Sequence, residues 1–273
     1  MAEHCYRHPD RETAVSCSSC GRPICPDCMT PTPVGMRCPE CSRQRTSVRT
    51  GTSAFGRSRA APATYVLIGL NVLAFLAEVA GGGGGFNTSG SVVHDFALRG
   101  NAVADGEWYR IVTGGFLHAG PLHLLFNMFA LYVLGSLLEP SIGTPRFVGL
   151  YLASLLAGSA GALLLSDAAE NTVGASGAIF GIFGAAFVIA RGRGLDVIAS
   201  EIGLLLLVNL ALTFGIPGIS IGGHLGGLIG GSICALFIIA GDRGMLGRRR
   251  IAAELAAMGA VGAISIGIAL AVA

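Results

Sequence analysis

Residues 174–177 read Gly-Ala-Ser-Gly, and they open the apolar run 178–190, which is long enough to enter a membrane. A second apolar run begins with residues 222–227, which read Gly-Gly-His-Leu-Gly-Gly. Ser176 is a candidate nucleophile, and His224 is a candidate base that could activate it. A serine and a histidine that both lie inside hydrocarbon-length segments predict hydrolysis within a bilayer.

The composition of the whole chain agrees with a membrane location. Hydrophobic residues make up 52% of the 273 residues and charged residues 12%. A bilayer core of about 30 Å needs about 20 apolar residues per helix, and helices satisfy their own backbone hydrogen bonds in hydrocarbon. We therefore predict an all-α polytopic membrane protein. Seven spans are expected, at about residues 63–80, 122–139, 146–165, 174–190, 197–215, 222–240 and 251–273.

Arginine placement predicts the orientation of these spans, because the chain contains no lysine. Between residue 43 and the last span, twelve arginines lie on one side of the predicted membrane, and two, Arg99 and Arg110, lie on the other. Cytoplasmic loops carry the excess of positive charge, so we expect a cytoplasmic N-terminus and an extracytoplasmic C-terminus. The first 60 residues are polar and cysteine-rich and show no cleavable signal peptide, so the first span is expected to act as an uncleaved signal. We therefore expect an integral, multi-pass cell membrane protein.

Seven of the eight cysteines lie before residue 42. With His8 they form four pairs that each enclose two residues: Cys5 with His8, Cys17 with Cys20, Cys25 with Cys28, and Cys38 with Cys41. Eight ligands suffice for two tetrahedral zinc ions. Disulfides are the alternative, and the reducing cytosol disfavours them. We predict a zinc-binding domain over residues 1–42, with two structural zinc ions that supply much of its folding free energy.

This spacing resembles the B-box type of zinc finger, in which the ligand pairs interleave. The resemblance implies two ligand sets: Cys5, His8, Cys25 and Cys28 for one ion, and Cys17, Cys20, Cys38 and Cys41 for the other. A sequential arrangement of ribbons is the alternative. A protein or peptide partner and a purely structural role are both open for this domain, and no nucleic-acid partner is expected. Residues 43–62 predict a flexible linker whose arginines can lie on anionic lipid.

Four polar groups lie in one shallow layer of the predicted membrane. His123 and Asn127 are four residues apart, so they lie on one face of the second span, with Asn127 about 6 Å deeper. Both lie near the outer end of their span, as do Ser176 and His224. Polar groups at that depth usually face the protein interior or a water-filled cavity, although hydrogen bonding between helices is an alternative for this pair. The layer predicts one site that water reaches from outside.

Glycines on two of the spans predict that these two helices pack closely at the site. Small residues at helical spacing allow two helices to touch backbone to backbone, which would bring His224 within reach of the Ser176 hydroxyl. The glycines concerned are Gly177, Gly181 and Gly184 in the fourth span, and Gly227 and Gly231 in the sixth. No carboxylate lies at this depth in the second, fourth or sixth span. We therefore predict a Ser–His dyad in which packing orients His224.

An acyl transfer also requires donors to the developing oxyanion. The backbone N–H of Ser176 lies at a helix N-terminus, where the helix dipole favours negative charge. The amide of Asn127 and a ring N–H of His123 could complete the oxyanion hole.

Taken together, these motifs resemble the rhomboid family of intramembrane serine proteases. The resemblance rests on residues 174–177, on residues 123–127, which read His-Leu-Leu-Phe-Asn, and on His224 with the glycines after it. Residues 107–110, which read Glu-Trp-Tyr-Arg, resemble a loop motif of the family, and Glu139 stands where the family has a glutamate. The similarity covers about residues 63–240. It implies a six-helix core over residues 63–242, followed by a cytoplasmic basic loop and a seventh transmembrane helix over residues 243–273.

The resemblance also implies roles for these residues. Ser176 would be the nucleophile, His224 the general base and then acid, and Asn127 and His123 the oxyanion contacts. Phe180 stands where many members have a tyrosine that stacks on the base. Substrates would be transmembrane proteins that enter laterally from the lipid bilayer, and catalysis would need no cofactor.

Two other classes of function compete with hydrolysis. An inactive relative of the family would bind membrane proteins and escort them, although such relatives typically lack the serine or the histidine. A transporter or a cofactor-binding protein would use the intramembrane histidines differently.

Overall fold

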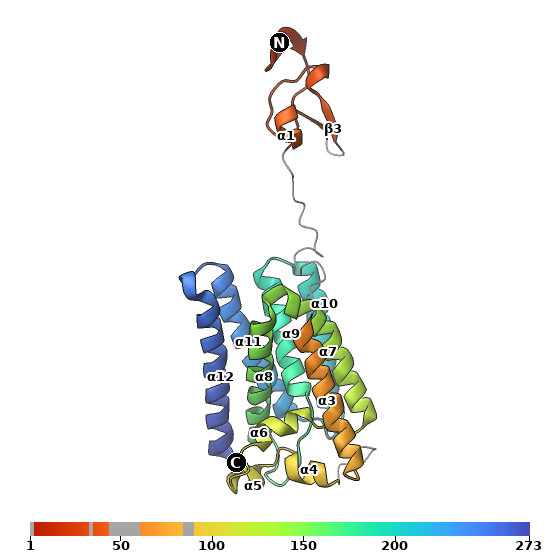
Figure 1. Ribbon diagram of the computed structural model, residues 1–273, viewed down its shortest axis with the longest axis vertical. Helices are drawn as coiled ribbons and strands as arrows, with labels where there is room; N and C mark the ends of the chain where they lie inside the picture. Colours follow the sequence, from red (N-terminus) through yellow and green to blue (C-terminus); the bar gives the residue numbers. More distant parts are fainter. Residues whose placement is uncertain (1–2, 33–34, 44–60, 84–89) are drawn as a thin grey trace. The chain divides into compact units, whose positions relative to one another are not determined.

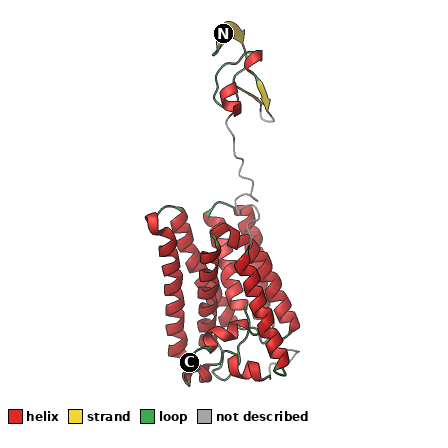
Figure 2. Ribbon diagram, in the orientation of Figure 1, coloured by secondary structure: helices red, strands yellow, loops and turns green. Residues whose placement is uncertain are grey.

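The computed structural model describes residues 3–32, 35–43, 61–83 and 90–273. The chain forms two compact units, Met1–Thr50 and Gly51–Ala273. Among the described residues, strands occur in the first unit and the second is helical (Figure 2). Most of the predicted linker, residues 43–62, lies outside the described residues.

The N-terminal unit consists of two short hairpins and two helical turns. Strands β1 (Glu3–Cys5) and β2 (His8–Thr13) pair antiparallel, as do β3 (Thr30–Thr32) and β4 (Gly35–Arg37). The turns are η1 (Pro26–Cys28) and α1 (Pro39–Arg43). Its buried core consists of Ile24 and six of the cysteines, so little apolar surface stabilises it.

In its described residues, the second unit is a bundle of seven long helices, with the short helices of residues 91–116 at one end (Figure 1). The long helices are α3 (Pro62–Ala80), α7 (Pro121–Ile142), α8 (Thr144–Leu165), α9 (Ser176–Gly192), α10 (Asp196–Gly215), α11 (Ile221–Asp242) and α12 (Arg250–Val272). The shorter ones are α4 (Ser91–Phe96), α5 (Gly100–Ala104), α6 (Arg110–Thr113), η2 (Gly114–Phe116) and η3 (Gly247–Arg249). The all-α polytopic architecture is thus confirmed.

Six of the long helices are long and apolar enough to cross a membrane, and α9, with 17 residues, is shorter. Seventeen residues is the low end of the range that spans a bilayer. The fourth span was expected from residue 174, but α9 begins at Ser176. Gly174 adopts φ +134°, a conformation that side-chain-bearing residues rarely take, so the chain turns there before the helix starts.

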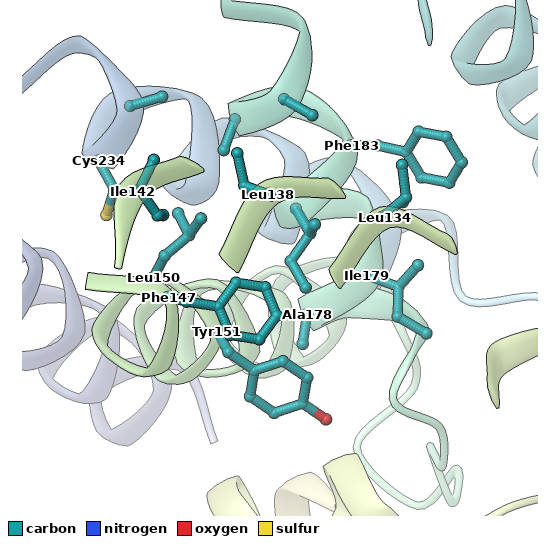
Figure 3. Packing of buried hydrophobic residues seen from close by; sticks show 14 of the residues in the cluster. Leu134, Leu138, Ile142, Phe147, Leu150, Tyr151, Ala178, Ile179, Phe183 and Cys234 are labelled. Atoms are coloured by element: carbon teal, nitrogen blue, oxygen red, sulfur yellow. The ribbon is translucent and has the colours of Figure 1, made fainter. Parts of the chain in front are cut away.

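The hydrophobic core lies where α7, α8, α9 and α11 meet. Figure 3 shows Leu134 and Leu138 of α7 packed over Phe147 and Tyr151 of α8, with Ile179 of α9 beside them. Twelve of the 17 residues of α9 are buried, whereas α10 buries only Ala199, Ile202 and Thr213. Helix α9 is therefore central to the bundle, and α10 is peripheral.

Glu139 near the end of α7 holds the start of α3. Its carboxylate accepts hydrogen bonds from the backbone N–H groups of Ala63 and Thr64, at 3.1 and 2.8 Å. It also accepts from the hydroxyls of Thr64 and Thr144, at 2.8 and 2.7 Å. A carboxylate at a helix N-terminus satisfies otherwise unpaired N–H groups and is favoured by the helix dipole. Glu139 therefore ties α3, α7 and α8 together.

A buried ion pair holds α12 against α8. Arg146 of α8 donates from Nε to the carboxylate of Glu254, and the two side chains are 12% and 0% exposed. Arg250, one turn before Glu254, also pairs with Asp242 at the end of α11, at 3.3 Å. The seventh helix is thus joined to the six-helix core by charged groups at one end.

We predict that Glu254→Ala destabilises the helical unit, because it leaves the Arg146 guanidinium buried without its partner. Breaking a buried pair from one side typically costs about 3–5 kcal/mol. Reversible unfolding in mild detergent measures the change. Glu170→Ala, in an exposed loop, serves as the control. Equal unfolding free energies for the two variants would contradict this account of α12.

Candidate active site

Helices α9 and α11 touch backbone to backbone through their glycines. A Cβ atom built on Gly227 would overlap the carbonyl oxygen of Gly177, and one on Gly231 would overlap the backbone of Gly181. Gly158 of α8 reaches the same point, since its Cβ would lie 3.0 Å from the Gly177 Cα. The close approach predicted from the glycine spacing is therefore present. It places the first residues of α9 directly beside the first turn of α11.

The segment that leads into α9 is held by the loop between α3 and α7. Leu98 and Thr172 exchange two backbone hydrogen bonds of 3.1 and 2.8 Å, and the N–H of Gly174 donates to the carbonyl oxygen of Gly114 at 3.0 Å. Ser159 of α8 donates to the carbonyl oxygen of Ile111 at 2.7 Å. Ser176 is thereby fixed from both sides, by the loop before it and by the helix after it.

Arg110 organises that loop from inside. It is 2% exposed and donates to the carbonyl oxygens of His94 and Ala97 at 2.8 and 2.9 Å. It also pairs with Glu107 at 2.5 Å, and its hydrogen bond lowers the pKa of that carboxyl. Trp108 beside it is 66% exposed. The Glu-Trp-Tyr-Arg motif thus combines a buried structural arginine with an exposed aromatic ring.

The His224 ring is held on two sides. Phe180, one turn into α9, stacks on it with a centroid distance of 4.0 Å and an interplanar angle of 18°. The expected stacking at Phe180 is therefore present. Thr213 of α10 places its hydroxyl oxygen 2.7 Å from the ring Nδ1. We expected packing by itself to orient His224. The structure adds a hydrogen bond with α10, a helix that the sequence analysis did not connect with the site.

His123 and Asn127 lie on α7, as expected from their spacing. A Cβ built on Gly174 would meet His123 Nε2 at 3.1 Å and Ser176 Oγ at 3.5 Å, so both groups border the turn before α9. The N–H of Ala119 donates to His123 Nδ1 at 3.3 Å, which leaves the proton of a neutral ring on Nε2. Asn127 is 7% exposed, and its buried Nδ2 has no hydrogen-bond partner among the described residues.

The predicted Ser–His pairing is not formed as a hydrogen bond. Among the hydrogen bonds of the described residues, none joins Ser176 Oγ to the His224 ring. Catalytic hydrogen bonds are often long without substrate and tighten when it binds. The α9–α11 contact instead brings their neighbours together, since a Cβ on Gly177 would lie 3.2 Å from the carbonyl oxygen of Gly223.

The eight predicted metal ligands of the N-terminal unit gather in two clusters. These are Cys5, His8, Cys25 and Cys28, and Cys17, Cys20, Cys38 and Cys41, with ligand atoms within 4.8 Å of one another. They are the two sets that the interleaved arrangement implies.

The separations inside the clusters suit a tetrahedral ion. His8 Nδ1 lies 3.4 and 3.5 Å from the sulfur atoms of Cys25 and Cys28, and the sulfur atoms of Cys20 and Cys38 are 3.8 Å apart. With zinc–nitrogen bonds of about 2.0 Å and zinc–sulfur bonds of about 2.3 Å, a tetrahedral site has nitrogen–sulfur distances of about 3.5 Å and sulfur–sulfur distances of about 3.8 Å. The N–H of Cys38 donates to the Cys17 sulfur and lowers the pKa of that thiol to about 6, which favours the thiolate that binds metals. The clusters can hold metal ions.

Sequence reasoning missed two polar residues around the site. Thr213 lies two residues before the end of the predicted span 197–215, so its depth matches that of the other site residues and could have indicated it. Glu78 is buried near the end of α3 and accepts from the N–H of His118 at 3.0 Å. His118 in turn packs edge-on against His123, with a centroid distance of 5.2 Å. An intramembrane glutamate was the available signal for this contact.

Comparison with known proteins identifies the family. Residues 105–241 match the family model described as "Rhomboid domain", and this half of the chain contains Asn127, Ser176 and His224. The chain belongs to the rhomboid family. The resemblance read from the motifs is thus correct.

Relatives of this rhomboid chain occur in bacteria and plants. It is 36% identical over 210 residues to rhomboid protease GluP of Bacillus subtilis, which covers 75% of this chain and 40% of GluP. It is 35% identical over 141 residues to putative rhomboid protease YdcA of the same organism, covering 50% of this chain and 70% of YdcA. RHOMBOID-like protein 5 of Arabidopsis thaliana is 35% identical over 141 residues, covering 50% of this chain and 45% of that protein. The chain therefore spans less than half the length of GluP.

We predict that Gly227→Ala forces α9 and α11 apart, because the new methyl group overlaps the Gly177 carbonyl. Overpacking of this kind costs about 1–3 kcal/mol. Gly259→Ala is the matched control, since a Cβ at that helical glycine of α12 meets nothing within 4 Å. The control should keep or gain stability, by up to about 1 kcal/mol. Unfolding in detergent measures both, and equal stability of the two variants would count against the close contact.

Proposed function

We propose that this rhomboid chain is an intramembrane serine protease that cleaves transmembrane protein substrates in or near their membrane segments. The observation that carries the proposal is the glycine contact between α9 and α11, in which Gly177, next to Ser176, meets Gly223, next to a histidine stacked on Phe180. The relatives named rhomboid proteases support the same reaction class. Substrates are proposed to enter laterally from the lipid bilayer.

In the proposed reaction, His224 accepts the proton of the Ser176 hydroxyl, and Oγ attacks the carbonyl carbon of the scissile peptide bond. The oxyanion that forms receives hydrogen bonds from the Ser176 N–H, from Asn127 Nδ2 and from His123 Nε2. The unpartnered amide of Asn127 supports this role. His224 then protonates the leaving amine, and a water molecule, activated by the same histidine, hydrolyses the acyl-enzyme.

We place the protease core at residues 63–242 and the added basic loop and seventh helix at residues 243–273. The helices make the chain a multi-pass membrane protein. Its proposed orientation has a cytoplasmic N-terminus and an extracytoplasmic C-terminus, because arginines are concentrated on one side. In that orientation, Ser176 and His224 lie near the outer leaflet.

Ser176→Ala is expected to abolish cleavage of a single-span test substrate and labelling by a serine-directed fluorophosphonate, because it removes the nucleophile. Asn127→Ala should retain activity at a level about 10²–10³-fold lower, the usual loss for one oxyanion donor. Ser200→Ala, on α10, is the control. Wild-type turnover by the Ser176→Ala variant would refute the assignment. No labelling of the wild-type chain would favour the inactive escort protein instead.

We also propose that the N-terminal unit, residues 1–42, is a B-box-like domain that binds two structural zinc ions. The fit of both clusters to tetrahedral geometry supports this, as does a small core of cysteines and one isoleucine. Metal binding would then supply much of the folding free energy of the unit. A protein or peptide partner is a proposed role for its surface.

Purified full-length protein should contain close to two zinc ions per chain by elemental analysis. Cys25→Ala and Cys38→Ala should each lower the content by about one ion, because they belong to different clusters. Cys234→Ala, in the core of α11, should leave it unchanged. A wild-type content near zero, or an equal loss in all three variants, would contradict the two-site proposal.

A further inference from the structure

The contact between Thr213 and His224 indicates which ring nitrogen of His224 carries the proton. Thr213 Oγ1 lies 2.7 Å from His224 Nδ1 and 2.8 Å from the carbonyl oxygen of Asn209. A carbonyl oxygen can only accept, and a hydroxyl has one proton to donate. Both contacts are hydrogen bonds only if Thr213 donates to the Asn209 carbonyl and accepts from Nδ1–H of His224. The neutral ring then carries its lone pair on Nε2.

We infer that Thr213 is a positioning residue that orients His224 and holds its ring as the Nδ1–H tautomer, so that Nε2 is free to accept the Ser176 proton. The inference rests on the proposed function for its catalytic meaning. Its structural content is the tautomer itself, which can be measured without substrate. A threonine hydroxyl thus takes the place that a carboxylate occupies in a Ser–His–Asp triad.

The burial pattern of α10 supports this role. Thr213 is 2% exposed, and the other two buried residues of this 20-residue helix, Ala199 and Ile202, are apolar. Burying a hydroxyl is unfavourable unless it forms hydrogen bonds. Thr213 forms one within its own helix and one across to α11. Among the described residues, no other side chain hydrogen-bonds to the His224 ring.

The second histidine of the site is held in the opposite way. The Ala119 N–H donates to His123 Nδ1, so the proton of that ring lies on Nε2. His123 therefore offers a donor toward Gly174 and Ser176, whereas His224 offers an acceptor. Neighbouring groups thus assign different proton positions to two rings of the same residue type, as an oxyanion donor and a general base require.

Three substitutions test the inference in the full-length protein. Thr213→Val removes the hydroxyl and keeps the shape, and Thr213→Ser keeps the hydroxyl. Asn209→Ala removes a side chain of α10 that donates to the Leu205 carbonyl oxygen of its own helix. The ¹⁵N spectrum of ring-labelled protein, with His224→Gln to assign the signal, reports the tautomer of His224. Cleavage of a single-span substrate separates kcat from KM.

We expect the Nδ1–H form in wild type and Thr213→Ser, and a shift toward Nε2–H in Thr213→Val. One neutral hydrogen bond corresponds to about tenfold, so kcat should fall about tenfold in Thr213→Val with KM little changed. Thr213→Ser should restore it, and Asn209→Ala should match wild type.

An Nε2–H ring in the wild type, or a tautomer unaffected by Thr213→Val, would overturn the inference. So would a Thr213→Ser variant as slow as Thr213→Val, because a role in packing alone would then suffice. Failure of the protease proposal looks different: the wild type would be neither labelled nor active, while the ¹⁵N signal would still decide the tautomer.

Discussion

The contact between the glycines of α9 and α11 is the constraint on which the rest of the structure depends. Because Gly177 and Gly227 have no side chains, the two backbones meet, and Gly158 lets α8 join them at the same point. Dispersion and close packing, rather than the hydrophobic effect, drive such association in lipid. The contact buries α9 in the middle of the bundle and brings Gly177, next to Ser176, against Gly223, next to His224. Larger residues here would separate the two groups without altering either one.

Much of the fold could be predicted from hydropathy, since all seven helices begin and end within about three residues of their expected bounds. Ser176, His224 and Phe180 could also be placed, because they occupy fixed positions on periodic helices. The helices α4, α5 and α6 were not foreseen, because the loop that contains them has no periodic apolar pattern. Thr213 was missed for another reason: a single hydroxyl in an apolar span shows its depth, but its partner depends on how far α10 approaches α11.

Backbone groups define the chemistry of the candidate site as much as side chains do. The N–H of Ala119 positions His123, the carbonyl of Asn209 directs the hydroxyl of Thr213, and the Gly114 carbonyl holds Gly174. Other ionisable side chains, at Glu139, at Arg110 and at the Arg146–Glu254 pair, join helices and loops away from these groups. Glu78, which accepts from the His118 N–H, is the exception that lies around the site.

The sparse packing of α10 gives the Thr213 contact a thermodynamic consequence. Helix α10 buries three residues, and one of them bonds to His224. The free energy of that bond therefore belongs both to the tautomer of the ring and to the position of the helix. By linkage, any ligand or lipid environment that favours α10 against α11 favours the proton on Nδ1, and a proton on Nδ1 favours that position of the helix to the same extent. The position of one peripheral helix and the tautomer of one imidazole are then a single equilibrium.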